Sequence, residues 1–145
     1  MAEAGAEAVM VNLGLHPKAR KGASWLDLFD RVQAGLPLSA LDQALRSVAP
    51  DDASLKYAIV PKATLARRIQ ARRLSAEESA KLVRLAKAWA FAKEVWRDDK
   101  AARRFLFEPH MLLQGRKPVD LVLANEIGAA LVTDVLGRLR YGSAA

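Results

Sequence analysis

Apolar residues recur along this chain at helical spacing, in one segment after another. Four of them, ahead of Gly35, follow the i, i+3, i+4, i+7 pattern: Trp25, Leu28, Phe29 and Val32. This spacing predicts a helix over residues 24–34, with Ser24 as its N-cap and Gly35 as its stop. Alternation with period two is absent outside residues 57–60, so the pattern predicts an all-α fold.

The next predicted elements form a helix-turn-helix outline. Three apolar residues after Pro37 share one helix face: Leu38, Leu41 and Leu45. After a break rich in Pro and Asp, we expect two short helices over residues 53–58 and 61–73, separated because a residue before proline avoids the α region. Leu65 and Ile69 are predicted to face inward from the second helix. A short helix, a tight turn and a basic helix match the outline of a DNA-binding motif.

A long helix is predicted from Ser75 to about residue 97. Ser75 and Glu78 have the spacing of a capping box, which satisfies free N–H groups where a helix begins. Two apolar stripes run along this segment, so we expect it to be buried from several sides and to join the two halves of the chain. Trp89 and Trp96 lie in one stripe. Core packing is the preferred interpretation of that pair, and a dimer seam is the alternative.

Shorter helices are predicted in the last third of the chain, over residues 101–107 and 118–123. Asn125 is the expected N-cap of a last helix over residues 126–140, which Gly142 ends. One face of that helix carries four apolar residues at helical spacing: Ile127, Leu131, Val135 and Leu139.

The first residues of the chain differ from the rest. Residues 1–10 are rich in Ala and Gly, and residues 16–22 mix helix breakers with charge, so we expect a loosely ordered arm. Acidic residues stand where a secretory signal needs positive charge, and no run approaches the roughly 20 apolar residues of a membrane span. With no cysteine for disulfides, the expected compartment is the cytoplasm.

The net charge of +7 points to a polyanionic partner, nucleic acid first. It is concentrated in residues 62–73, which hold five Lys and Arg side chains and no acid. On a helix, Arg67 and Gln70 are placed to reach base edges, and the cations at the ends to reach phosphates. The candidate DNA contacts are Lys62, Ala63, Thr64, Arg67, Gln70, Arg72 and Arg73. The alternatives are an ordinary solvated basic face, and Arg68 or Arg72 bracing the core through an acid.

Residues suited to catalysis or metal binding are scarce. The two histidines, His16 and His110, have no visible partner, and there is no cysteine. The sequence lacks a Gly-rich phosphate loop, a nucleophile elbow and a histidine–glutamate zinc motif. We therefore expect no catalytic residue, no metal and no cofactor, and interpret the chain as a binding protein rather than an enzyme.

Short motifs in the second half of the chain occur in a characteristic order. They are Leu74–Ser79 before a Leu/Ala/Trp-rich helix, Phe105-Leu106 with Pro109-His110, Gly115–Leu121, and Glu126–Gly142. With the helix-turn-helix outline, residues 35–145 resemble the Xre/MbcA/ParS antitoxins, whose partners are RES-domain toxins. Phe105 stands where the family usually has Trp, and His110 where Asn is frequent. Both exchanges are compatible with packing, so they affect surface detail more than class.

The resemblance implies an Xre-like helix-turn-helix domain that binds the operon's own operator, followed by a small helical toxin-binding domain. It suggests an arm and first helix over residues 1–34, a DNA-binding and dimerisation domain over 35–97, and a toxin-binding domain over 98–145. The toxins of this family consume NAD or use it to ADP-ribosylate targets, and the antitoxins obstruct their NAD pocket. The residues that match the toxin-binding motifs are Arg116, Arg138, Arg140, Tyr141 and Gly142.

Arg and Tyr are enriched among interface hot spots, which favours an interface role for the last helix. The alternative is that its arginines only complement the helix dipole. We thus expect a homodimeric antitoxin of the bacterial cytoplasm that blocks a RES-domain toxin and represses its own operon at operator DNA, without a membrane partner. Two other functions stay open: a stand-alone helix-turn-helix regulator, and an antitoxin of an ADP-ribosylating toxin that lacks DNA binding.

Overall fold

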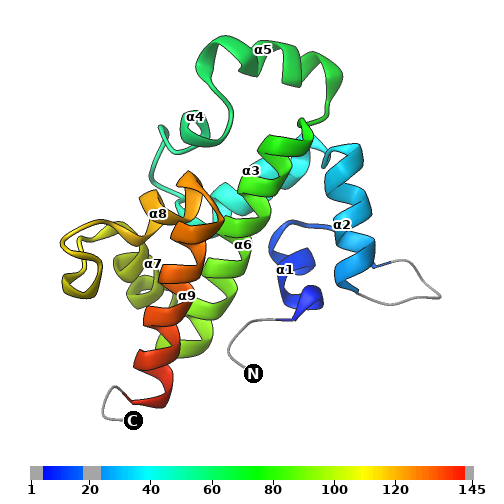
Figure 1. The fold of residues 1–145 in the computed structure, drawn as a ribbon. Coiled ribbons are helices and arrows are strands. Elements are labelled where there is room, and N and C mark those ends of the chain that lie inside the picture. The colour runs from blue at the N-terminus through cyan, green and yellow to red at the C-terminus, as the bar shows by residue number, and fades with distance from the viewer. Residues whose placement is uncertain (1–4, 18–23, 143–145) are drawn as a thin grey trace.

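Helices make up the fold of this chain in the computed structural model, which describes residues 5–17 and 24–142 (Figure 1). The elements are α1 Ala6–Asn12, α2 Trp25–Ala34, α3 Leu38–Val48, α4 Lys56–Ile59, α5 Lys62–Ala71, α6 Ala76–Trp96, α7 Asp99–Phe107, the 3-10 turn η1 Met111–Leu113, α8 Pro118–Ala124 and α9 Glu126–Tyr141. Within the described ranges no strand forms, and the pairings Pro37–Arg73 and His110–Arg116 are isolated bridges. The predicted all-α class is confirmed.

The long helix α6 is the spine of the molecule. The capping box predicted at its start is present: Ser75 Oγ accepts from the Glu78 N–H at 3.1 Å, and Glu78 Oε1 accepts from the Ser75 N–H at 2.8 Å. Helices α1, α2 and α3 pack on one flank, and α7, α8 and α9 on the other (Figure 1). Trp89 is 1% exposed within this core, whereas Trp96 lies at the far end of the helix and is 40% exposed.

The expectation of a loosely ordered N-terminal arm is wrong for residues 6–15. Residues 6–12 form α1, and Val9, Met10 and Leu13 are buried against the core, each at most 1% exposed. An isolated helix of this length is unstable in water, so packing against α6 stabilises it. The helical pattern of this segment was not recognised in the sequence, because alanines surround its few large apolar residues. Residues 1–4 and 18–22 of the expected arm lie outside the described residues.

Helix α2 forms where the sequence predicts it but presents an unexpected face. Ser24 Oγ accepts from the Asp27 N–H at 3.1 Å, and Gly35 ends the helix with φ 92°. A Cβ at Gly35 would overlap the Leu74 carbonyl oxygen, which requires a glycine there. Of the predicted apolar stripe only Leu28 is buried, while Phe29 and Trp25 are among the exposed apolar side chains.

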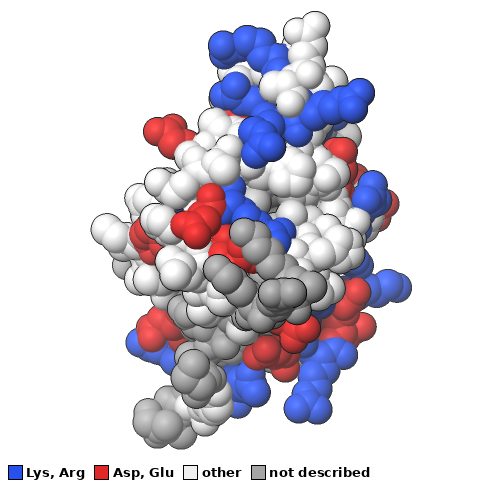
Figure 2. All heavy atoms as spheres, turned by 90° about the vertical axis from the view of Figure 1, so that its right-hand side faces the viewer, with Lys and Arg blue, Asp and Glu red and all other residues white. Residues whose placement is uncertain are grey.

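Charge is unevenly distributed over the surface. Lys and Arg side chains gather at the end of the molecule occupied by α5, and the opposite half carries both signs (Figure 2). The cations at the α5 end include Lys62, Arg67, Arg72 and Arg73, which are all exposed. The concentration of positive charge seen in the sequence is therefore also a concentration in space.

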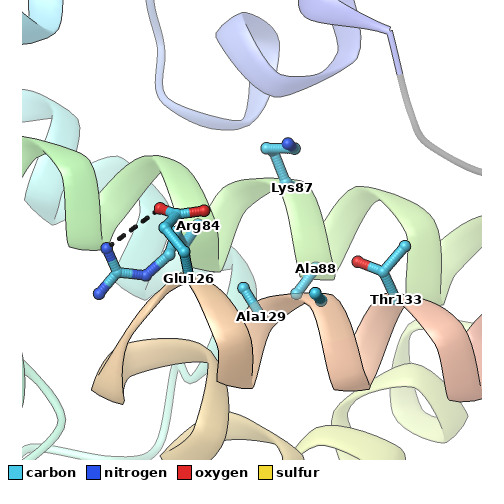
Figure 3. A pocket seen from close by; sticks show the side chains of 7 residues that line it. Arg84, Lys87, Ala88, Glu126, Ala129 and Thr133 are labelled. Carbon is cyan, nitrogen blue, oxygen red and sulfur yellow. Dashed lines mark ion pairs between the residues drawn. The ribbon is translucent and has the colours of Figure 1, made fainter.

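Arg84 joins the spine to the last two helices. Its Nε donates to the Val122 carbonyl at 2.8 Å, and its Nη2 donates to the Leu123 carbonyl at 3.0 Å. These are carbonyls at the end of α8 that have no partner within the helix. Arg84 also pairs with Glu126 at 3.5 Å, beside a small pocket between α6 and α9 (Figure 3). This arginine therefore holds the junction of α8 and α9 against α6.

The apolar face that the sequence pattern gives to α9 lies mostly at the surface. Val135 is buried, but Ile127, Leu131 and Leu139 are 74%, 47% and 39% exposed. The buried face consists instead of Gly128, Val132, Val135 and Leu136. The rotation follows from Gly128, which lies so close to α8 that a Cβ would overlap the Leu121 carbonyl oxygen. A pattern of large apolar residues does not reveal a contact made through a glycine.

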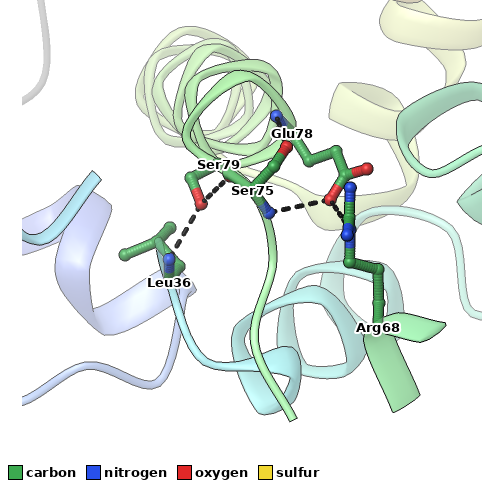
Figure 4. A network of polar contacts seen from close by, with 5 residues as sticks. All are labelled: Leu36, Arg68, Ser75, Glu78 and Ser79. Atoms are coloured by element: carbon green, nitrogen blue, oxygen red, sulfur yellow. Dashed lines mark hydrogen bonds and ion pairs between the residues drawn. The ribbon is translucent and has the colours of Figure 1, made fainter. Parts of the chain in front are cut away.

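A polar network ties the base of α5 to the start of α6 (Figure 4). Arg68 Nε donates to Glu78 Oε1 at 2.7 Å, and the same oxygen accepts the Ser75 N–H. Ser79 Oγ accepts the Leu36 N–H at 2.8 Å. Burial raises the pKa of Glu78, but the hydrogen bonds from Arg68 and Ser75 outweigh it, so the net pKa of this carboxyl lies below its ordinary value.

Two glycines of α9 provide a matched pair for testing the α8–α9 contact. We expect Gly128→Ala to lower the free energy of unfolding by about 1–3 kcal/mol, because its Cβ meets the Leu121 backbone. Gly137→Ala should raise it by about 0.5–1 kcal/mol, since a Cβ there meets nothing within 4 Å and alanine favours the helix. Urea unfolding measures both free energies. A lower free energy of unfolding in both variants would contradict this packing.

The Glu78 network should make stability depend on pH. The folded pKa of Glu78 lies below the unfolded value of about 4.3, so its contribution is fully present above that pH and is lost as the pH falls through the folded pKa. The difference in unfolding free energy between the wild type and Glu78→Gln should therefore shrink between about pH 6 and about pH 3. The neighbouring exposed Glu77→Gln serves as the control. A difference that is independent of pH would contradict the assignment.

Candidate binding surfaces at the two ends of the molecule

Helix α5 stands at one end of the molecule, away from the main body (Figure 1). None of its residues is buried. It follows α4 after the turn at Val60-Pro61, as the sequence predicts, and begins at Lys62. It ends at Arg72, which adopts a left-handed conformation with φ 57°. A short, accessible and basic helix is thus presented at the surface on a fixed base.

The structure brings the predicted DNA contacts together on α5 and the two residues that follow it. All are exposed except Thr64, which is half-buried. Arg67 and Gln70 are accessible on the open side of the helix, and Lys62 lies over the Tyr57 ring at 5.7 Å. Arg73 differs from the others because its Nη1 donates to the Gly35 carbonyl at 2.7 Å. That contact braces the turn between α5 and α6, so the side chain of Arg73 also has a structural task.

The side of α5 that faces the body differs from the expected one. Leu65 is half-buried as predicted, but Ile69 is 54% exposed. Arg68 takes the inward position instead, through its ion pair with Glu78. One of the two bracing arginines considered in the sequence is therefore confirmed, and the ion pair explains the rotation of the helix. Ile69 lies at the surface of α5 next to Gln70.

The end of α9 forms the second candidate surface, at the opposite end of α6. Arg138, Arg140, Tyr141 and Gly142 lie together in the last turn and are exposed. Arg138 pairs with Asp134 at 3.3 Å, one turn earlier. Arg140 pairs with Glu94 of α6 at 2.5 Å and lies 5.5 Å from the centre of the Tyr141 ring. Sequence spacing offered no signal for the partner Glu94, which lies 46 positions away.

Arg116 belongs to the loop between η1 and α8. The chain before α8 lies apart from the end of α9 (Figure 1). Its Nη1 donates to Gln114 Oε1 at 3.2 Å, and its carbonyl accepts the His110 N–H at 3.1 Å. His110 in turn packs against the Phe105 ring with 5.5 Å between ring centres, and its Nδ1 accepts the Leu112 N–H at 3.2 Å. Both His110 and Phe105 thus act in packing the loop.

Neither surface brings together the groups of a catalytic or metal site. Over the described residues no group of three His, Cys, Asp or Glu side chains is placed to hold a metal ion. Over the same ranges, no helix is both long enough and apolar enough to cross a membrane. The arrangement presents charged and aromatic side chains at two ends, which suits the recognition of large partners.

Comparison with protein families assigns a family domain to each half. The model of the antitoxin Xre-like helix-turn-helix domain matches residues 27–87, and that of the antitoxin Xre/MbcA/ParS C-terminal toxin-binding domain matches residues 91–142. No curated protein matches the sequence significantly. The first match contains α5 and the second contains the end of α9, in the order that the sequence resemblance indicated. The chain therefore belongs to the Xre/MbcA/ParS antitoxins and carries an Xre-like helix-turn-helix domain followed by a toxin-binding domain.

Proposed function

We propose that this antitoxin inhibits an NAD-consuming RES-domain toxin with the end of α9 and represses its own operon with α5. The observation that carries the proposal is the placement of the two surfaces at opposite ends of one helix. Glu78 holds Arg68 of α5, and Glu94 holds Arg140 of α9. Sixteen positions of α6 separate these acids, about 24 Å at a rise of about 1.5 Å per residue. Operator and toxin are then bound at the same time without overlap.

The DNA half of the proposal rests on accessibility and charge. Small residues such as Ala63 and Ala66 allow the α5 backbone to approach a groove floor, while Arg67 and Gln70 extend toward base edges. Lys62, Arg72 and Arg73 are placed for phosphates. A single helix of this kind reads one half-site, so we propose a homodimer that spans two half-sites of an operator. Because such an operator lies in the bacterial cytoplasm, we propose that the protein acts there.

The toxin half of the proposal rests on the exposed last turn of α9. Arg140 and Tyr141 combine a planar cation with an aromatic ring, the residue types that dominate interface energetics. A guanidinium is suited to pairing with an acidic residue in a cofactor pocket, because it forms two parallel hydrogen bonds. We therefore propose that Arg138, Arg140, Tyr141 and Gly142 obstruct the NAD pocket of the toxin, with Arg116 at the margin of the complex.

Arg67→Ala tests the DNA half. We expect it to weaken binding to the operator by about 1–3 kcal/mol and to reduce discrimination against a scrambled duplex, because a base contact is lost. Fluorescence anisotropy at fixed salt measures both affinities. Arg138→Ala is the matched control, an exposed arginine at the other end, and should leave them unchanged. Wild-type protein without any operator affinity would instead favour an antitoxin that lacks DNA binding.

Truncation after Leu136 tests the toxin half. We expect it to weaken the toxin complex by at least about 2 kcal/mol and to restore NAD turnover by the toxin, because the last turn of α9 is removed. Leu136 is the last buried residue of α9, so the fold and the operator affinity should remain. Arg67→Ala is the control here and should inhibit like the wild type. Full toxin activity beside the intact chain would favour a stand-alone regulator.

A further inference from the structure

A groove between α1 and α6 opens beside the end of α9. Helix α1 lies outside both family matches, which begin at residues 27 and 91, yet it packs directly against the spine (Figure 1). The groove is lined by Ala8, Val11, Asn12, Ala90, Lys93 and Glu94. Its α1 wall is therefore outside the family domains, while Lys93 and Glu94 on the α6 wall belong to the matched toxin-binding domain.

The walls of this groove are fixed in place. Val9 and Met10 are fully buried beneath α1, so the helix is held on α6 and its open side is defined. Val11 is on that open side and is 62% exposed. Nothing in the described part of the chain covers it. The groove thus offers an apolar rim on a rigid support.

The floor of the groove carries polar groups that are only partly satisfied. Asn12 is 7% exposed, and its Oδ1 accepts from Lys93 Nζ at 3.1 Å. The Asn12 Nδ2 has no acceptor among the described residues. An amide buried without a partner costs free energy, so it marks a place where a contact is incomplete. With Lys93 beside it, this floor suits a partner that supplies hydrogen-bond acceptors.

One side chain links the groove to the proposed toxin surface. Glu94 lines the groove and is also the residue that pairs with Arg140 at the end of α9. A protein bound to Arg140 and Tyr141 is therefore separated from the groove only by the side chain of Glu94. The chemistry of the two neighbouring surfaces is similar, since each combines an exposed apolar or aromatic group with a cation.

We propose that the bound toxin extends from the end of α9 into the groove between α1 and α6, with an apolar side chain against Val11 and carbonyl or carboxylate oxygens toward Lys93. This inference rests on the proposed inhibition of a toxin and adds a second contact to it. Because α1 lies outside the family domains, the groove provides contacts specific to this chain and its own toxin. A second copy of the chain is the competing occupant.

Val11→Arg in the full-length chain tests the proposal. Isothermal titration against the RES-domain toxin of the same operon, inactivated in its catalytic site, measures the dissociation constant. We expect at least about a tenfold increase in this constant, because a charged side chain replaces the apolar contact made at Val11. Leu26→Arg is the matched control, since Leu26 is an equally accessible apolar residue of α2 at 71% exposure, and it should change affinity less than about twofold.

Thermal unfolding of both variants should match the wild type within about 2 °C, because both sites are exposed. If Val11→Arg binds the toxin as tightly as the wild type does, while truncation after Leu136 abolishes binding, the groove contact is overturned and the proposed function stands. A wild-type chain that does not bind the toxin would overturn both. If Val11→Arg instead abolishes self-association in sedimentation and leaves toxin affinity unchanged, the groove belongs to a second copy and the proposal fails.

Discussion

The carboxylate of Glu78 is the interaction on which the arrangement of this antitoxin depends. It accepts the Ser75 N–H at the start of α6 and the Nε–H of Arg68 from α5, so one group caps the spine and orients the basic helix α5. Its side chain is 9% exposed, and a charge so far from water is tolerated only when it is paired. Since no residue of α5 is fully buried and Leu65 is its one side chain packed against the core, this ion pair adds anchoring to a small apolar contact.

Helix boundaries were predictable because their signals are local. Ser24, Ser75 and Asn125 each cap a helix through a hydrogen bond to a backbone N–H three residues later. Such contacts depend only on neighbouring residues, so spacing in the sequence identifies them. The basic segment was identifiable for the same reason, since its charges are contiguous. The order of the two family domains followed from motifs that each lie within a few residues.

What could not be predicted depends on contacts between distant segments. Periodicity correctly identified α9 as amphipathic, but not that Ile127 and Leu131 remain exposed while Gly128 packs on α8. On α5, Arg68 rather than Ile69 faces the body of the molecule, because it pairs with Glu78, ten positions later. Likewise, α1 consists of a short run rich in small residues, and it becomes a helix only through its contact with α6. Glu94 acquires its role only once α9 returns along the spine.

A single hydrophobic core extends from Val9 to Leu136 and includes residues from both family domains. Helices that share one core unfold together, so a partner bound at either end stabilises the whole chain by mass action, about 2.7 kcal/mol at a hundred times its dissociation constant. Proteases in the cell act mainly on opened chains, whose population falls with that stabilisation. A chain with a partner at either end would therefore open less often, and be degraded more slowly, than a chain without one.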